Sequence, residues 1–131
     1  MNKVQVVAAI IVNNRRFLLG KRAPHKTAPG WWSPVSGRIE LGETESEAAE
    51  RECQEEVGLT VRAVRKITEM DINEGKARLH WWLVDVVSGE AWLKNDEHTE
   101  LRWMTIEEMG RTENVFTEDI PVFASVLPKE D

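Results

Sequence analysis

The sequence predicts a mixed α/β domain in which β-strands are flanked by a few helices. Three observations support this prediction. Stretches rich in β-branched residues alternate with turn signals, one Glu-rich segment lacks Gly and Pro, and the 131 residues match the size of one domain. Because no repeat or Pro/Ser-rich linker interrupts the chain, we expect a single domain over residues 1–131.

The expected strands follow one another in chain order. Residues 4–12 are β-rich, and a polar turn at 13–16 leads to a second strand at 17–22. Residues 23–36 hold three of the five prolines and predict a structured loop. Two longer strands are expected at 61–71 and 77–87, and a short one at 101–104. The order of the strands in the sheet does not follow from these patterns.

Local signals mark the helices. Thr44 and Glu47 have the spacing of a capping box, and Gly58 is suited to end a helix, so a helix is expected over 45–57. Thr105 and Glu108 repeat the capping-box spacing before a short second helix. A terminal helix is expected over 118–127, with a proline in its first turn.

The net charge of −6 is concentrated in one segment. Residues 37–59 contain eight glutamates and two arginines, whereas the rest of the chain is neutral. An acidic chain argues against a general binder of nucleic-acid polymers or of anionic membranes, which normally presents a basic face. The same carboxylates suit a metal-dependent enzyme.

The single cysteine, Cys53, excludes an intramolecular disulfide and gives no sign of an oxidising compartment. The apolar run at 4–12 is interrupted by Gln5 and is followed by Asn-Asn-Arg-Arg, which favours a strand over a signal peptide. No segment reaches the roughly 20 apolar residues that span a bilayer. We therefore expect a cytoplasmic protein that does not enter a membrane.

Three carboxylates share one side of the expected helix. At 100° per residue, Glu52, Glu55 and Glu56 lie within an arc of about 100°. Like charges this close raise each other's pKa unless cations intervene, and clustered carboxylates suit Mg²⁺ or Mn²⁺. The alternative for a Glu-rich helix is a solvated acidic face with some salt bridges.

The spacing around this helix resembles a known motif. Gly37 is followed after five residues by Glu43, and after seven more by the run Arg-Glu-Cys-Gln-Glu-Glu-Val-Gly-Leu at 51–59. This pattern over residues 37–59 resembles the Nudix box of the Nudix hydrolases, with MutT-type pyrophosphohydrolases matching in size and layout. Cys53 stands where a larger aliphatic is usual, and Ser36 replaces the first glycine of a common Gly-Gly pair.

The resemblance implies a Nudix-type α/β/α sandwich with a mixed β-sheet, and a set of site residues. Glu52, Glu55 and Glu56 would coordinate Mg²⁺ or Mn²⁺, with the carbonyl of Gly37 as an extra ligand. Arg51 would orient a neighbouring carboxylate and pair with Glu43. A further acid from outside the box would be Glu97, with Glu100 in reserve, and either Glu52 or Glu97 could be the general base.

Substrate contacts are implied less specifically. Lys21, Arg22 and Arg38 are candidates for phosphate binding, although each could be an ordinary surface cation. Trp32, or Trp31 beside it, is the candidate for stacking on a base. Asp119 occupies the position where MutT-type enzymes read a purine, although it would also suit the first turn of a helix. The three histidines lack metal-ligand spacing and are interpreted as ordinary surface or partly buried residues.

The leading hypothesis is a metal-dependent pyrophosphohydrolase that cleaves a nucleoside triphosphate, oxidised dNTPs included, to a nucleotide and pyrophosphate. Its partner would be a small nucleotide, and it would act as a monomer or homodimer. One alternative is hydrolysis of another nucleoside-diphosphate derivative, such as ADP-ribose or a nucleotide sugar. Another is a catalytically silent domain that senses a nucleotide.

Overall fold

Strand β1 (Val4–Asn13) is the centre of the sheet in the computed structural model, which describes residues 3–128. It runs parallel to β6 (Ala77–Ser88) and antiparallel to β4 (Val35–Arg38), and its last residues pair antiparallel with β2 (Arg16–Arg22). Residues 6–12 of the strand are apolar without interruption, and residues 7–11 are buried on both faces, as expected for a central strand.

The remaining strands extend the sheet on both sides of β1. The order is β3-β2-β1-β6-β5, where β3 is Trp32–Ser33 and β5 is Thr60–Ile72, while β7 (His98–Met104) pairs with β2. One parallel pair among antiparallel ones makes the sheet mixed, which confirms the predicted class.

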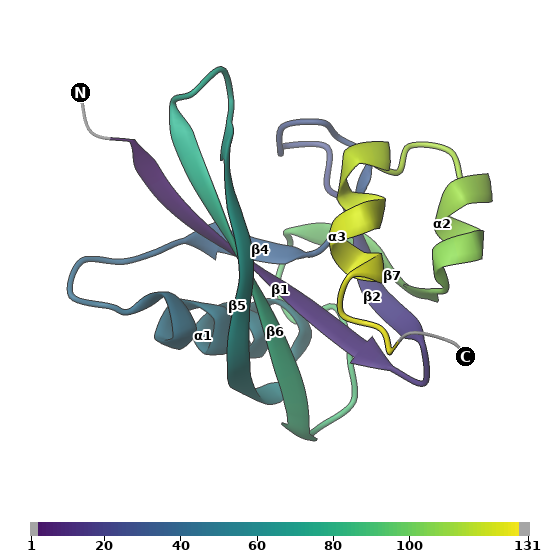
Figure 1. The fold of residues 1–131 in the computed structure, drawn as a ribbon, viewed down its shortest axis with the longest axis horizontal. Coiled ribbons are helices and arrows are strands. Elements are labelled where there is room, and N and C mark those ends of the chain that lie inside the picture. The colour runs from purple at the N-terminus through teal and green to yellow at the C-terminus, as the bar shows by residue number, and fades with distance from the viewer. Residues whose placement is uncertain (1–2, 129–131) are drawn as a thin grey trace.

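Helices cover both faces (Figure 1). Alternate residues of β1 point to opposite faces. Val7 and Ile11 belong to the core under α1 (Glu45–Val57), whereas Ala8 and Ile10 belong to the core shared with the C-terminal helices. These helices are α2 (Ile106–Arg111) and α3 (Ile120–Ala124), preceded by the short 3₁₀ turn η1 (Thr117–Asp119). The result is the expected sandwich of helix, sheet and helix.

Helix α1 has the ends that its sequence predicts. The Thr44 hydroxyl accepts the Glu47 backbone N–H at 3.1 Å, and the Glu47 carboxylate accepts the Thr44 N–H at 2.9 Å. Gly58 ends the helix in the left-handed conformation, with φ at 68°, and its N–H bonds to the carbonyl of Gln54 at 3.2 Å. Both capping devices are local in sequence, which is why the boundaries were predictable.

Three predicted boundaries were wrong. The expected loop at 23–36 contains β3 and the start of β4, because its end pairs with β2 and β1. The short strand expected at 101–104 begins at His98, because β2 extends its pairing to there. The terminal helix expected at 118–127 is divided into η1 and the five-residue α3. Within residues 3–128, no helix is long and apolar enough to cross a membrane.

Phe123 attaches the short helix α3 to the sheet. Its ring is 1% exposed, and its centroid lies 5.1 Å from that of Phe17 and 5.5 Å from that of Trp81. We expect Phe123→Ala to lower the free energy of unfolding by about 3–5 kcal/mol, because it leaves a cavity in the core. Urea unfolding measures this, with Leu41→Ala, at a fully exposed leucine, as the control of small effect. A loss no larger than that of the control would contradict the anchoring role of Phe123.

Candidate active site

A cavity of about 900 Å³ opens between α1, the sheet and the loops around it. Its wall combines the end of β4, the inner side of α1, the loop after β2, the start of β7 and η1. The structure therefore joins segments from both halves of the chain. The predicted site residues that line this cavity are Arg22, Gly37, Arg38, Glu52, Glu56, Glu97 and Asp119.

Arg51 ties the segment before α1 to the helix. Its Nε and Nη2 donate to the two carboxylate oxygens of Glu43 at 2.7 and 2.9 Å, and Nη2 also donates to the carbonyl of Arg38 at 2.9 Å. Its Nη1 donates to Glu52 at 2.8 Å and to Glu55 at 3.1 Å. A bidentate guanidinium contact fixes direction as well as distance. The expected pairing of Arg51 with Glu43 is present, and Arg51 also orients Glu52.

Glu55 lies apart from the cavity lining. Its side chain is 54% exposed and points to Arg51, although the helical arc placed it beside Glu52 and Glu56. The two other glutamates turn inward, so that Glu52 is 9% and Glu56 is 2% exposed. The acidic arc is thus divided between the cavity and the surface.

Gly37 makes room for Glu52. A Cβ atom at this glycine would overlap the Glu52 carboxylate, so the backbone of β4 lies directly against that carboxylate. The absence of a side chain, rather than an unusual backbone angle, is what the position requires. The structure thereby brings together Gly37 and Glu52, two of the site residues expected from the sequence.

The two inward carboxylates are costly to ionise together. The pKa of Glu52 is raised to about 8, first by burial and then by the neighbouring Glu56, against the lowering effect of Arg51. Burial also raises the pKa of Glu56, and Glu97 and Glu55 add to this shift. Burial with like charges nearby is the arrangement that a bound cation relieves.

Glu56 has one satisfied and one unsatisfied oxygen. Its Oε1 lies 3.0 Å from Nε2 of His98, which is 7% exposed. Its Oε2 is buried and has no hydrogen-bond partner among the described residues. Sequence reasoning missed His98, because its partner is 42 residues away and no spacing indicates the contact.

Glu97 also lines the cavity, from the position directly before β7. Its carboxylate contacts Nζ of Lys26 at 2.5 Å, and both side chains are about one third exposed. Glu100, the reserve candidate, lies on β7 and pairs with Arg102 at 3.1 Å. Of the two acids outside the box, the structure brings Glu97 to the cavity.

Basic residues line the cavity near these acids. Arg22 is held by the loop that follows it, with Nε donating to the Thr27 carbonyl at 2.5 Å and Nη2 to its hydroxyl at 2.8 Å. Burial lowers the pKa of Arg22, while Glu97 and Glu56 act in the opposite direction. Arg38 and Lys26 also line the cavity, and the sequence had not indicated Lys26. Lys21 lies outside this lining, opposite Glu100 in the β2–β7 pair.

The aromatic candidates take other positions. Trp32 is 6% exposed in the core beside α2 and α3, and the Arg102 guanidinium lies 4.7 Å above its ring. Pairing with β2 carries it into the sheet rather than into the cavity. Trp31 lies against Phe116, at 4.8 Å between ring centroids, and it is Phe116 that lines the cavity.

Asp119, at the end of η1, lines the same cavity as the acidic helix residues. Its pKa is raised to about 7, mainly by burial and also by neighbouring Glu118. Ser33 and Trp81 line the same cavity, and neither the Ser33 hydroxyl nor the Trp81 Nε1–H has a partner among residues 3–128. The cavity therefore offers two donors without partners among the described residues, and one carboxyl group with a raised pKa.

The donor set suits a hard divalent cation. Glu56 Oε2 lacks a partner, Glu52 lies beside Glu56, and both carry raised pKa values that a cation would reverse. Within the described part of the chain, no group of three His, Cys, Asp or Glu side chains is already gathered closely enough to hold a metal. Two of the expected metal ligands are instead engaged in ion pairs, Glu55 with Arg51 and Glu97 with Lys26.

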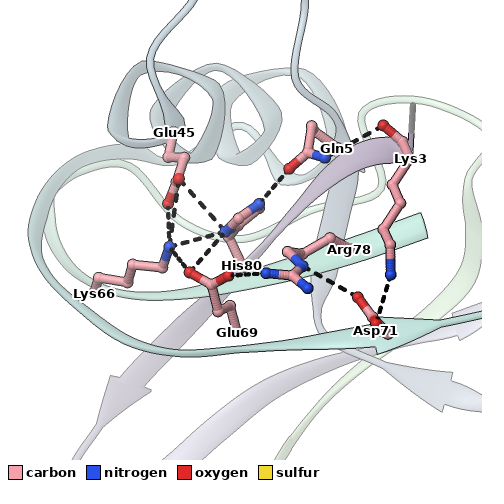
Figure 2. Close-up of polar contacts among 8 residues, drawn as sticks. All are labelled: Lys3, Gln5, Glu45, Lys66, Glu69, Asp71, Arg78 and His80. Atoms are coloured by element: carbon pink, nitrogen blue, oxygen red, sulfur yellow. Dashed lines mark hydrogen bonds and ion pairs between the residues drawn. The ribbon is translucent and has the colours of Figure 1, made fainter. Parts of the chain in front are cut away.

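A second polar cluster attaches the opposite end of α1 to the sheet (Figure 2). Glu45, the first residue of the helix, accepts from Trp82 Nε1 at 2.9 Å and contacts Lys66 at 3.0 Å. Lys66 lies 2.9 Å from Nδ1 of the buried His80, whose Nε2 contacts Gln5 at 2.6 Å. The helix is therefore fixed to β1, β5 and β6 at its start and to β4 and β7 along its acidic side.

Known proteins show the same sequence pattern. A sequence profile of the NUDIX domain matches residues 2–126. The chain is 33% identical over 109 residues to the 8-oxo-dGTP diphosphatase of Escherichia coli K12, covering 81% of this chain and 83% of that one. It is 32% identical over 110 residues to the CTP pyrophosphohydrolase of the same strain, covering 82% and 80%.

Solved structures show the same fold. A MutT protein from Methanosarcina mazei Go1 has a TM-score of 0.78 at 23% identity, covering 95% of this chain and 94% of that one. A NUDIX-family hydrolase from Clostridium perfringens has a TM-score of 0.80 at 21% identity, covering 95% and 96%. With its box residues around one cavity and its profile match over almost the whole length, the chain belongs to the Nudix hydrolase family.

Proposed function

We propose that this hydrolase is a metal-dependent pyrophosphohydrolase that cleaves a nucleoside triphosphate to a nucleotide and pyrophosphate. The observation that carries the proposal is the cavity in which buried Glu52 and Glu56 face a wall with Arg22, Lys26 and Arg38. Such a site suits a cation and the phosphate oxygens that accompany it. Oxidised dNTPs and CTP are the substrate classes to test first, because the two relatives described above are named for 8-oxo-dGTP and CTP.

Glu52, Glu56 and Glu97, with the Gly37 carbonyl, would hold Mg²⁺ or Mn²⁺, and Glu55 would join them from the rim after release from Arg51. A bound metal ion lowers the pKa of a coordinated water and offsets charge on the phosphates. Arg51 keeps Glu52 directed at the cavity, and Arg22 and Arg38 bind phosphate oxygens. One of Glu52 and Glu97 takes the proton from the attacking water.

Asp119, Ser33 and Trp81, which line the same cavity, support placing the base beside them. The Asp119 carboxyl group, together with a hydroxyl and an indole N–H that lack partners among the described residues, can bond to the edge of a nucleobase. Lys21 and Trp32 lie outside the cavity lining, so their positions give no support to the substrate contacts expected of them. We further propose a single domain over residues 1–131 that acts in the cytoplasm on small nucleotides, as a monomer or homodimer.

A panel of nucleotides with Mg²⁺ tests the activity. We expect a nucleoside triphosphate to yield the monophosphate and pyrophosphate, separated by ion-exchange chromatography and assayed with and without a coupled pyrophosphatase. Orthophosphate as the first product, or preference for ADP-ribose or a nucleotide sugar, would contradict the triphosphate assignment. No hydrolysis of any member of the panel would contradict the enzyme assignment and favour a sensor.

Replacing the inward glutamates tests the site. We expect Glu52→Gln and Glu56→Gln to lower kcat/KM by roughly 10²- to 10⁴-fold, because each removes a charged oxygen from the reacting centre. Steady-state kinetics over a range of Mg²⁺ concentrations measure the effect, with Glu107→Gln on exposed α2 as the control that retains activity. If Glu52→Gln or Glu56→Gln keeps near-wild-type kinetics, the role proposed for that glutamate is wrong.

The same carboxylates predict the pH dependence of stability in the metal-free protein. The folded-state pKa of Glu52 is raised from 4.5 to about 8, so the folded protein holds a proton that the unfolded chain releases. Its stabilising contribution is complete below pH 4.5 and is lost as the pH rises through the folded-state pKa. Glu52→Gln should therefore gain stability relative to wild type between pH 5 and pH 8, by at least about 1.4 kcal/mol, the value of one pKa unit.

Urea unfolding of both proteins in a chelator buffer measures this difference. The comparison is made between variant and wild type because Asp119, with a pKa raised to about 7, titrates in the same range and contributes to both curves. A difference that stays constant from pH 5 to pH 8 would contradict the raised pKa of Glu52.

A further inference from the structure

His98 and Glu56 form a buried pair that joins the start of β7 to the acidic side of α1. The distance from Nε2 to Oε1 is 3.0 Å, and the residues are 7% and 2% exposed. Both residues line the cavity, but their contact is almost completely shielded from solvent, which strengthens the hydrogen bond and restricts its geometry. His98 directly follows Glu97, so one strand start supplies both the cavity acid and the partner of Glu56.

The position of the imidazole is set by strand β2. A Cβ atom at Gly20 would overlap the ring, and Nδ1 is the ring atom nearest to that position. The β2–β7 register shifts between Lys21 and Arg22, the residue that pairs with His98. A bulge re-aims the side chain next to it, and a glycine in a strand often marks a close approach of this kind. Gly20 and the bulge together leave the space that the His98 ring occupies.

The direction of the hydrogen bond follows from the charge of Glu56. A carboxylate that is to hold a cation must be ionised, and it then only accepts hydrogen bonds. Nε2 of His98 is therefore the donor, and Nδ1 is left as an acceptor against Gly20 without a partner among residues 3–128. Both ring nitrogens are thus turned away from a ligand role, and the oxygen that remains free is Oε2 of Glu56.

We propose that His98 is a positioning residue that holds the Glu56 carboxylate by Oε1, so that Oε2 faces the cation site. Gly20 is required in this arrangement because a side chain there would displace the imidazole ring. His98 touches neither substrate nor metal in this role. The inference rests on the proposed function, since it assumes that Glu56 binds the metal ion. Partners behind a ligand of this kind typically contribute about 10- to 100-fold to metal affinity.

Mn²⁺ binding in the absence of substrate, measured by titration calorimetry, tests the proposal without depending on turnover. We expect His98→Ala to weaken Mn²⁺ binding by about 10- to 100-fold. His98→Gln, which returns an N–H donor on a chain of similar reach, should recover most of the affinity. In kinetics, the Mg²⁺ concentration for half-maximal rate should rise while the KM for the nucleotide at saturating Mg²⁺ stays constant.

His80 offers a matched control. It is 5% exposed, lies on the same sheet and contacts Gln5 and Lys66 rather than the cavity (Figure 2). His80→Ala should lower thermal stability and leave Mn²⁺ affinity unchanged. If both alanine variants weaken Mn²⁺ binding equally, or if His98→Ala leaves it intact, the positioning role is wrong.

A double-mutant cycle with Gly20→Ala tests whether Gly20 acts by making room for the His98 ring, and it remains informative if one variant is poorly folded. In the wild-type background the new methyl group should displace the ring and weaken Mn²⁺ binding. In the His98→Ala background no ring is left to displace, so Gly20→Ala should change Mn²⁺ affinity little further. Equal losses in the two backgrounds would overturn the coupling between Gly20 and His98.

Glu56→Gln separates this inference from the proposed function. If Glu56→Gln leaves Mn²⁺ affinity intact, the metal role of Glu56 fails and the inference fails with it. If Glu56→Gln weakens binding and His98→Ala does not, the proposed function stands and the positioning role alone is refuted. Loss in Glu56→Gln and His98→Ala, with recovery in His98→Gln, supports both.

Discussion

The burial of two carboxylates on adjacent turns of α1 is the constraint to which the rest of the site responds. Glu52 and Glu56 must lie inward because Ala49, Cys53 and Val57 beside them pack against the sheet. Two acids cannot share a dry space without donors to support them. The protein supplies these donors from two separate segments, α1 itself and the start of β7, both of which line the cavity.

Each donor arrives from a different part of the fold. Arg51 comes from the helix itself and reaches back to Glu43 and the Arg38 carbonyl, which closes the loop before α1. His98 comes from the start of β7, where Gly20 and a register shift make space for it. The acids are therefore held from the helix and from the sheet, and the loop before α1 fixes Arg51 in turn. The second cluster around Glu45 and Lys66 keeps the helix start in place, so that these contacts stay aligned (Figure 2).

The parts of the fold that the sequence predicted are those fixed by local signals. Helix α1 was predicted from end to end because its capping box and its C-terminal glycine act within a few residues. The long strands were predicted nearly in full by their β-rich runs. Trp32 was misplaced in the interpretation because a two-residue strand, too short to leave a pattern, pairs it with β2 and buries it.

The same distinction applies to the site. Arg51, Glu52 and Glu56 follow from spacing along one helix, so the sequence placed them together. Glu55 lies at the edge of the same arc, and its exposure is decided by Arg51, a contact that angular position alone does not reveal. His98 and Lys26 depend on the β2–β7 register and on the loop after β2, and their partners are 42 and 71 residues away. No local signal carries contacts over such separations.

The concentration of the net charge takes on a physical meaning in this arrangement. Glu52 and Glu55 already share Arg51, Glu97 has Lys26 and Glu56 has one N–H from His98. A metal ion that binds here competes with Lys26 for Glu97 and with Arg51 for Glu55, whereas Oε2 of Glu56 is opposed by no internal donor among the described residues. Because a cation would gain most at a buried oxygen without a partner, we expect Glu56 to contribute most to the attraction of a cation, and the acidity of the whole chain says little about its outer surface.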